Sequence, residues 1–220
     1  ISGVATAAKA LKPSIKIVGV QTSNIPSMKE SLEKGEVTSA FKDVTIADGI
    51  AVKTPGNLTF SIIKDIIDEI IVVDEDEIAQ AMLFLLENQK VTSEGSGAVS
   101  TAVIWSGKYI PKKDENVVCI ISGGNIDINT LYRVIDTGLV KCGRRYTFRT
   151  HIVDRPGGLS EVTRILTDLN ANILSANMSK LSSKHGLGSQ AVELTIETFD
   201  EKHKEEIRES IIKAGFEISD

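Results

Sequence analysis

The run 122–125, Ser-Gly-Gly-Asn, has the composition of a ligand-binding turn. It follows an apolar stretch at 116–121 and precedes a helix-patterned stretch at 127–137. A strand that ends in paired glycines and a small hydroxyl presents that hydroxyl at the carboxyl edge of a sheet, where open α/β folds bind ligands. The alternative is a strand-to-helix turn in which Asn125 or Asp127 serves only as the helix N-cap.

The chain around this run alternates between helical periodicity and short apolar runs. Such alternation predicts a parallel sheet that is covered by helices on both faces. Asp74, with Glu77 three residues later, is typical of a capping box that opens a helix. The predicted strands are 15–20, 44–47, 70–73 and 116–121, and the predicted helices are 2–11, 27–35, 57–69, 75–89 and 127–137.

Length and charge limit the class of protein. The 220 residues suffice for two ordinary domains, and 41% hydrophobic content can fill a core. A formal net charge of -5 disfavours nucleic acid and anionic membranes as partners. No run approaches the roughly 18 apolar residues that cross a bilayer, and the first twenty residues carry no basic leader. We therefore expect a soluble globular protein.

The cysteines and histidines indicate neither a disulfide framework nor a zinc site. Cys119 lies in a predicted buried strand and Cys142 in a predicted linker, so the pair does not form a framework. We infer a reducing cytoplasm as the location. His151, His185 and His203 have no ligand-like spacing with either cysteine, which argues against structural zinc.

Three further motifs accompany the Ser-Gly-Gly-Asn run. They are Ile-Ser-Gly at 1–3, Ala-Asp-Gly-Ile-Ala-Val at 47–52 and Glu-Gly-Ser-Gly-Ala at 94–98. In order and approximate spacing, the four motifs resemble the pyridoxal-phosphate-dependent threonine ammonia-lyase and serine racemase family. The resemblance implies that the first part of the chain belongs to a fold-type II parallel-sheet lobe.

The same resemblance implies four cofactor-binding residues. Ser122 would hydrogen-bond the pyridine nitrogen, with Gly123 beside it. Glu94 would lie near the ring, and Gly49 would permit close approach of the backbone. A hydroxyl partner leaves the pyridine nitrogen largely unprotonated, and the weaker electron sink that results suits loss of a β-hydroxyl. Taken alone, Gly49 could be a plain surface turn and Glu94 an ordinary first-turn carboxylate.

Two parts of the family's cofactor site lie upstream of Ile-Ser-Gly. One is a tetraglycine loop that holds the cofactor phosphate at a helix N-terminus. The other is the lysine, within Ser-Phe-Lys-x-Arg-Gly, that bonds the cofactor aldehyde. Lys42 lies in Ala-Phe-Lys-Asp, lacks the rest of that motif and is interpreted as a surface lysine. We therefore expect the later part of a longer protein, with no catalytic residue of its own, inactive alone and unable to retain pyridoxal phosphate.

Gln21 and Ser27 bear on metal binding. They stand where serine racemase-like relatives carry two carboxylates that help to hold a divalent cation. A neutral amide and a hydroxyl are poor replacements for charged ligands of a hard cation. The sequence therefore predicts no metal of this kind.

The run 138–145 has two glycines, three cations and no clear period. We expect it to separate a catalytic portion, 1–140, from a second domain, 146–220. The second domain has the pattern βαββαβ, which predicts a ferredoxin-like sandwich. Its predicted strands are 146–153, one that begins at 172, 191–198 and 216–219, its predicted helices begin near 159 and at 201, and a turn is predicted at 182–189.

Two motifs in the second domain, at 154–162 and 170–173, resemble the ACT domain, a regulatory amino-acid-binding module. N–H groups at the start of its first helix could receive an amino acid's carboxylate, and Asp154 or Asn172 could hold the ammonium. In family members that bind at a dimer interface, these contributions come from different subunits. The alternative is a domain that only dimerises. The implied effector-binding residues are Asp154, Pro156, Gly157, Gly158, Leu159, Asn172 and Ile173.

The favoured function is that of the C-terminal part of a pyridoxal-phosphate-dependent threonine ammonia-lyase, which converts threonine to 2-oxobutanoate and ammonia. Its ACT domain would sense an amino acid. Two alternatives stay open: a non-catalytic amino-acid-binding and oligomerising fragment, and a relative of serine racemase or serine dehydratase. The implied partners are an amino-acid effector and further copies of the chain, in a homodimer or tetramer formed through both domains.

Overall fold

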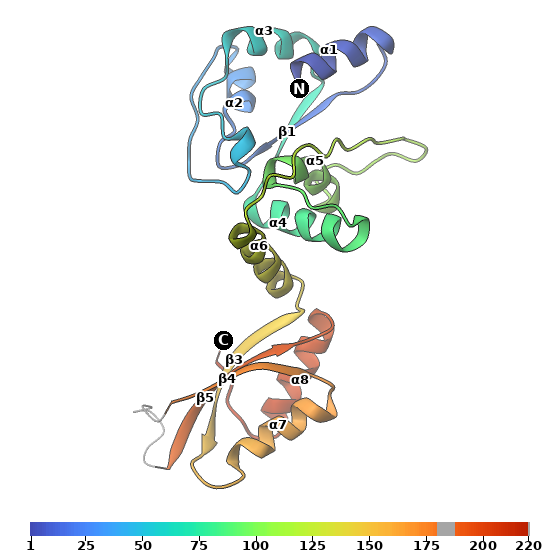
Figure 1. Cartoon of the computed structure of the whole chain (residues 1–220). Coiled ribbons are helices and arrows are strands. Elements are labelled where there is room, and N and C mark those ends of the chain that lie inside the picture. The colour runs from blue at the N-terminus through green and yellow to red at the C-terminus, as the bar shows by residue number, and fades with distance from the viewer. Residues whose placement is uncertain (180–187, 220) are drawn as a thin grey trace. The chain divides into compact units, whose positions relative to one another are not determined.

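The computed structural model describes residues 1–179 and 188–219 and divides into two compact units, Ile1–Ile135 and Asp136–Asp220 (Figure 1). The first unit contains a parallel sheet with helices, and the second contains an antiparallel sheet with helices. The mixed α/β class expected from the sequence is therefore confirmed. Within the described residues, no helix combines the length and the apolar character needed to cross a membrane.

The first unit is built on one short parallel strand pair. Strands β1 and β2 pair from Val18 opposite Glu69 to Thr22 opposite Val73. Helices α4 and α5 pack against each other beside the pair (Figure 1). The elements are α1 (Ser2–Leu11), β1 (Val18–Thr22), α2 (Ser27–Lys34), η1 (Asp48–Ile50), α3 (Asn57–Ile66), β2 (Glu69–Val73), α4 (Glu75–Phe84), η2 (Leu85–Gln89), α5 (Gly95–Trp105) and α6 (Ile128–Lys141), whose last six residues belong to the second unit.

Local sequence signals explain where several of these helices begin and end. The predicted capping box of α4 is confirmed, because Asp74 Oδ1 accepts from Glu77 N at 2.9 Å and Glu77 Oε2 accepts from Asp74 N at 2.7 Å. Helix α2 ends at Gly35, whose φ of 77° is costly for residues with a Cβ. The predicted helices at 2–11 and 27–35 are confirmed, and α3 ends at Ile66, earlier than predicted.

The core of the first unit lies between β2 and the helices α4 and α5. Apolar residues at helical spacing on α4 meet small residues on α5, which lets the two helices approach closely. The buried members include Val73, Ile78, Ala81, Met82, Leu85, Ala98, Ala102 and Val134. This core positions the first turn of α5, which carries the Glu-Gly-Ser-Gly-Ala motif.

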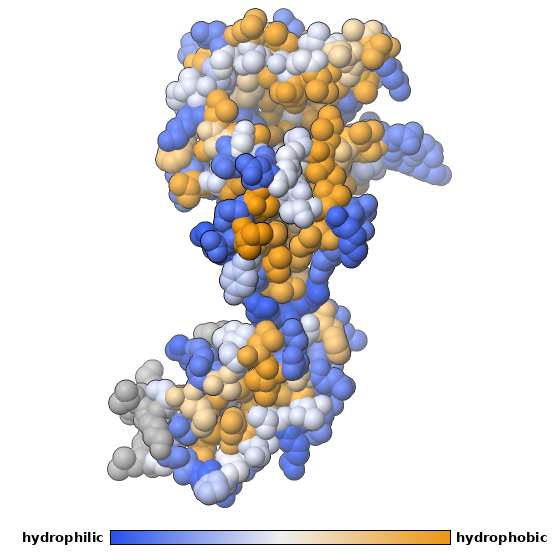
Figure 2. Space-filling view, viewed as in Figure 1, coloured by the Kyte–Doolittle hydropathy of each residue, from blue (hydrophilic) through white to orange (hydrophobic). Residues whose placement is uncertain are grey.

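Two predicted strands are wrong. Residues 44–47 and 116–121 have no strand conformation, although both are apolar enough to suggest one. A strand needs a ladder partner, and β1 and β2 pair only with each other among the described residues. Side chains of 116–121 reach the surface instead: Val118 is 85% exposed and Ile120 57%. Figure 2 shows hydrophobic side chains on the viewed surface of this unit.

The predicted linker is wrong in part. Helix α6 continues through 138–141 and ends at Lys141, so only the residues 142–144 separate it from the next strand. Gly143 adopts a φ of 67° there, a conformation that glycine accepts without strain. The glycines and cations of this run indicate a linker, but Leu139 and Val140 between them are compatible with the last turn of a helix.

The second unit is an antiparallel sheet in the order β3-β5-β4. The last predicted strand, 216–219, is reduced to one bridge, in which Arg149 and Ser219 exchange backbone hydrogen bonds of 2.8 and 2.9 Å. The predicted turn at 182–189 falls mostly outside the described residues. The elements are β3 (Arg145–Val153), α7 (Gly158–Asp168), β4 (Asn172–Ser179), β5 (Ser189–Glu197) and α8 (Glu201–Lys213).

One face of this sheet is covered by α7 and α8. Alternate residues of β3 and β5 point to that face, as the strand period of two requires. They pack against apolar residues that recur at helical spacing on the two helices. The buried set is Tyr146, Phe148, Ile152, Val192, Leu194 and Ile196 on the strands, with Val162, Leu166, Ile207 and Ile211 on the helices.

Both cysteines are free thiols. Cys119 does not lie in a buried strand as predicted, but in the irregular segment, where its Sγ donates to the carbonyl of Ser100 at 3.2 Å. Partial burial raises the pKa of the Cys119 thiol. Cys142 is exposed directly after α6.

Candidate functional site

The four residues predicted to lie near a cofactor converge in the first unit. A methyl group placed on Gly123 would lie 2.4 Å from Glu94 Oε1, and one on Gly49 would lie 3.2 Å from the same oxygen. Glu94 N also donates to the carbonyl of Gly123 at 3.3 Å. These contacts bring together three segments that are far apart in sequence: the η1 turn, the start of α5 and the Ser122–Gly123 turn.

Glu94 is the centre of this cluster. It precedes α5 as its N-cap residue, and its Oε1 accepts from the Ser96 hydroxyl at 2.5 Å. A methyl group on Gly49 would lie 2.6 Å from that same hydroxyl oxygen. Ser96 therefore holds the Glu94 carboxylate against the η1 backbone. Sequence analysis did not single out Ser96, although its spacing of two residues from Glu94 is the available signal.

Two glycines in the first turn of α5 lie directly against loops. A methyl group on Gly97 would lie 1.9 Å from the carbonyl oxygen of Ser122, so only glycine fits there. Gly95 would likewise collide with the carbonyl oxygen of Ile46, at 2.4 Å. The first turn of α5 thus sets the positions of two loops. Ser122 itself is exposed, with its backbone held by this contact.

A cavity of about 330 Å³ reaches the same region. Its wall includes Gly49 and Ile50 from η1, Gln21 from β1, and Ile1 and Ser2 at the N-terminal end of α1. The first N–H groups of a helix have no intrahelical acceptors and favour anions. The cavity therefore combines a helix N-terminus with a glycine at which the backbone can be approached closely.

Lys42, Gln21 and Ser27 also bear on the sequence predictions, and of these Gln21 and Ser27 line the cavity. Lys42 is exposed in the irregular segment before η1. Gln21 Oε1 accepts from Lys29 N at 2.9 Å, and the Ser27 hydroxyl donates to the carbonyl of Val52 at 2.5 Å. Both side chains are thus used in holding the backbone. In the part of the chain that the structure describes, no group of three or more His, Cys, Asp and Glu side chains is arranged for a metal.

In the second unit, the run from Asp154 to Leu159 turns from β3 into α7. Gly157 has a φ of 88°, and a methyl group on Gly158 would lie 2.2 Å from the carbonyl oxygen of Val153. Gly158 N donates to the carbonyl of Arg155 at 3.1 Å, so its N–H is not free as expected. The turn therefore leaves fewer helix N–H groups for a ligand than the sequence suggested.

The structure does not bring Asn172 and Ile173 to this turn. Asn172 pairs with Glu197, which pairs with Arg145 at the start of β3, whereas Asp154 follows the other end of β3. Asn172 Nδ2 donates to Glu197 Oε2 at 2.8 Å. Within one copy, the two predicted ammonium ligands thus lie at opposite ends of the sheet.

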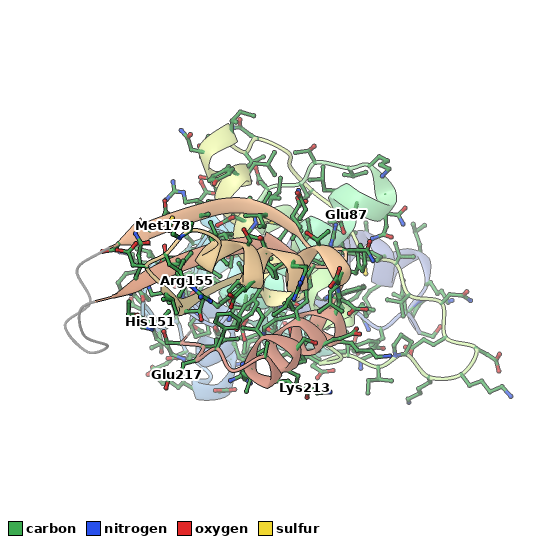
Figure 3. All side chains as sticks on the ribbon, turned by 90° about the horizontal axis from the view of Figure 1, so that it is seen from below. Glu87, His151, Arg155, Met178, Lys213 and Glu217 are labelled. Atoms are coloured by element: carbon green, nitrogen blue, oxygen red, sulfur yellow. The ribbon has the colours of Figure 1, made fainter. Side chains whose placement is uncertain are left out.

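Three further side chains lie at the end of the sheet near Asp154. His151, Arg155 and Met178 are labelled there in Figure 3, and in the register His151 pairs with Ala191 and Met178 with Val192 of β5. Arg155 forms an ion pair with Glu161 of α7 at 3.1 Å. Met178 is 48% exposed.

Comparison with known proteins agrees with these two units. The family described as "Pyridoxal-phosphate dependent enzyme" matches residues 1–123, and the ACT domain family matches 146–215. The L-threonine ammonia-lyase of Thermotoga maritima is 46% identical over 218 residues, which cover 99% of this chain and 54% of that protein. That of Geobacter sulfurreducens is 37% identical over 216 residues, which cover 98% and 54%.

A solved structure is similar as well. The processed form of threonine deaminase isoform 2 from Solanum lycopersicum aligns with a TM-score of 0.58 and 34% identity, covering 63% of this chain and 39% of that one. The chain spans about half the length of the curated relatives it matches. Since the first family accounts for more than half of its residues, the chain belongs to the pyridoxal-phosphate-dependent enzymes and carries an ACT domain.

Proposed function

We propose that this chain is the later part of a pyridoxal-phosphate-dependent threonine ammonia-lyase, which converts threonine to 2-oxobutanoate and ammonia. The observation that carries the proposal is the convergence of Gly49, Glu94 and the Ser122–Gly123 turn from three distant segments. Two relatives named L-threonine ammonia-lyase, which match nearly the whole chain, support the choice of reaction.

The residues present fit the cofactor. A cavity of about 330 Å³ is of the size that holds small ligands. Its helix N-terminus, at Ser2, suits a phosphate group. The absence of a Cβ at Gly49 and Gly123 lets both backbones lie directly against Glu94. The N-terminal end of α1 would hold the phosphate group of pyridoxal phosphate, and Gly49, Glu94 and Ser122 would hold its ring.

Each residue has a distinct role in this arrangement. The cofactor, when bound, supplies the electron withdrawal that lets bonds at the substrate's α-carbon break. Ser122 would donate a hydrogen bond to the pyridine nitrogen, and the proton stays on the Ser122 oxygen because an alcohol is a very weak acid. Glu94, held by Ser96 at 2.5 Å, would fix the η1 turn against the ring edge.

The ACT unit supplies regulation in this proposal. It would bind an amino-acid effector at the turn from Asp154 to Leu159, with Asn172 of a second copy completing the site. This division is consistent with the separation of Asp154 and Asn172 in one copy. The protein would act in the cytoplasm as a homodimer or tetramer.

Two measurements test the lyase proposal. The coding sequence directly upstream of Ile1 is expected to contain a tetraglycine loop and a Ser-Phe-Lys-x-Arg-Gly motif. The protein that includes it is expected to release 2-oxobutanoate from threonine when pyridoxal phosphate is added, whereas the 220 residues alone form no borohydride-trappable, catalytically active adduct. Unrelated upstream sequence, or threonine that remains unchanged, would overturn the proposal. Faster turnover of serine than of threonine would favour a serine dehydratase instead.

Calorimetry tests the regulatory part. The chain is titrated with isoleucine, valine, threonine and serine, and at least one is expected to release heat that Asp154→Ala abolishes. An absence of heat with all four would reduce the ACT unit to a dimerising module.

A further inference from the structure

The Glu75 carboxylate accepts three hydrogen bonds at the carboxyl ends of β1 and β2. Its Oε1 accepts from Thr22 Oγ1 at 2.9 Å and from Asn24 Nδ2 at 3.3 Å, and its Oε2 accepts from Ile46 N at 2.7 Å. Thr22, the last residue of β1, is fully buried. One side chain thus joins the ends of both strands to the loop that contains Ile46.

This loop has little regular structure to fix it. Between α2 and α3, the only helix or strand is the short η1 turn. The backbone is held instead by side chains: Asn24 Nδ2 donates to the carbonyl of Val44 at 2.6 Å, and Thr45 Oγ1 accepts from Ala47 N at 3.1 Å. Because no ladder is present, these hydrogen bonds decide where the peptide between Ile46 and Ala47 lies.

Helix α5 closes the other side of the same peptide. A methyl group on Gly95 would lie 2.4 Å from the carbonyl oxygen of Ile46 and 3.0 Å from Ala47 N. The peptide between Ile46 and Ala47 therefore lies between the Glu75 carboxylate and the first turn of α5. The carboxylate accepts a hydrogen bond from the adjacent Ile46 N–H. Ala47 is fully buried at this point.

The candidate cofactor site begins at η1, whose first residue, Asp48, directly follows Ala47. Ile50 N donates to the carbonyl of Ala47 at 3.1 Å and Ala51 N to that of Asp48 at 3.0 Å, so η1 is a tight unit that moves with Ala47. Gly49 within it contacts Glu94 and Ser96. A shift at Ile46 would therefore change the gap between Gly49 and Glu94.

We propose that Glu75 is a positioning residue, which sets the cofactor-facing turn Asp48–Ile50 through its hydrogen bond with the Ile46 amide. The part of this inference that concerns the cofactor rests on the proposed function. The carboxylate does not touch the cavity; it acts through the backbone of Ile46 and Ala47.

Glutamine is the informative substitution. Each oxygen of the carboxylate accepts, and all three partners are donors. An amide keeps one acceptor and turns the other position into a donor, which faces either the Ile46 N–H or the Thr22 and Asn24 donors. Glu75→Gln thus breaks the geometry at nearly constant volume. Asp76→Asn, in the same first turn of α4, is the matched control for loss of charge near the helix N-terminus.

The test has two arms. In the 220-residue chain, amide hydrogen exchange at Ile46 is expected to be about tenfold faster in Glu75→Gln than in wild type and unchanged in Asp76→Asn, because a hydrogen bond to a charged acceptor is lost. In the protein extended by its upstream residues, the half-saturating concentration of pyridoxal phosphate, followed by its visible absorbance, is expected to rise about tenfold in Glu75→Gln alone.

The outcomes separate the two claims. Unchanged exchange at Ile46, or equal half-saturation of Glu75→Gln and wild type in a protein that binds the cofactor, would overturn the positioning role. A general loss of stability without a change in half-saturation would also overturn it, since Glu75 would then only support α4. An extended wild-type protein that leaves pyridoxal phosphate unbound would overturn the proposed function.

Discussion

The two units assemble their candidate ligand-binding residues in opposite ways. In the first unit, Gly49, Glu94 and Gly123 come from distant segments and lie in contact, with no room for a Cβ between them. In the second unit, Asp154 and Asn172 are close in sequence but lie at opposite ends of one sheet. Sequence distance is therefore a poor guide to which residues share a site.

The difference follows from how each backbone is fixed. The first site is made of loops that side chains and glycine contacts hold in place, such as Gly97 against the carbonyl of Ser122. The second is made of strand ends, whose positions the antiparallel ladder determines. A loop can bring distant residues together, whereas a strand of nine residues, such as Arg145–Val153, keeps its ends far apart. One copy thus brings Gly49, Glu94 and Gly123 into contact but keeps Asp154 and Asn172 apart.

A mixing experiment offers the largest expected effect. Asp154→Ala and Asn172→Ala should each abolish binding of the amino-acid effector in calorimetry. If the two residues of a site come from two copies, an equal mixture of the variants regains about a quarter of the wild-type binding capacity, because half of the dimers are mixed and each has one intact site. A mixture that binds nothing, in variants that still exchange subunits, would contradict a shared site.

Gly97→Ala tests how tightly the first site is packed. The added methyl group would lie 1.9 Å from the carbonyl oxygen of Ser122, so the backbone of the turn must move. We expect a loss of roughly 3 kcal/mol in the free energy of unfolding of the first unit, measured by chemical denaturation. Gly3→Ala in α1 is the control, since a methyl group there meets nothing within 4 Å. Equal stability of the two variants would show that the turn is not fixed by this contact.

The helix caps of the two units give a smaller contrast. Asp74 begins α4 with a reciprocal capping box, whereas Asp200 begins α8 with one bond, from His203 N at 2.8 Å. We expect Asp74→Ala to lower the free energy of unfolding by up to about 2 kcal/mol and Asp200→Ala by about 1 kcal/mol. Denaturation curves measure both. A larger loss for Asp200→Ala would mean that the second arm of the box contributes nothing.

Much of the fold could be predicted because its signals are local. Asp74 with Glu77 gave the start of α4, and Gly35 gave the end of α2. The order of the glycine and hydroxyl motifs indicated residues that do meet, around Glu94. These signals depend on neighbours within one turn or on a family pattern, so the sequence displays them directly.

The features that escaped prediction depend on distant partners. The apolar run 116–121 has the composition of a strand, but strand formation also requires a neighbour with free ladder groups. Glu75 has the appearance of an ordinary first-turn carboxylate, and only the fold shows its bonds to Asn24 and Ile46. The contacts of Gly95 with Ile46 and of Gly97 with Ser122 likewise join segments that are far apart in sequence.

The smallest expected effect is a pH dependence that belongs to the first unit. A hydrogen bond from Ile17 N at 2.7 Å, followed by one from Lys9 at 2.8 Å, lowers the pKa of Asp68. A carboxylate whose pKa is lower in the folded state contributes stability above its unfolded pKa and loses it as the pH falls through the folded value. Wild type should therefore be more stable than Asp68→Asn at neutral pH, and the difference should shrink progressively as the pH falls below roughly 4. Because Asp68 is partly exposed, salt should reduce the difference.

Urea titrations at several pH values measure the difference in the free energy of unfolding between wild type and Asp68→Asn. A difference that persists in acid would assign the effect to the shape of the side chain and not to its charge.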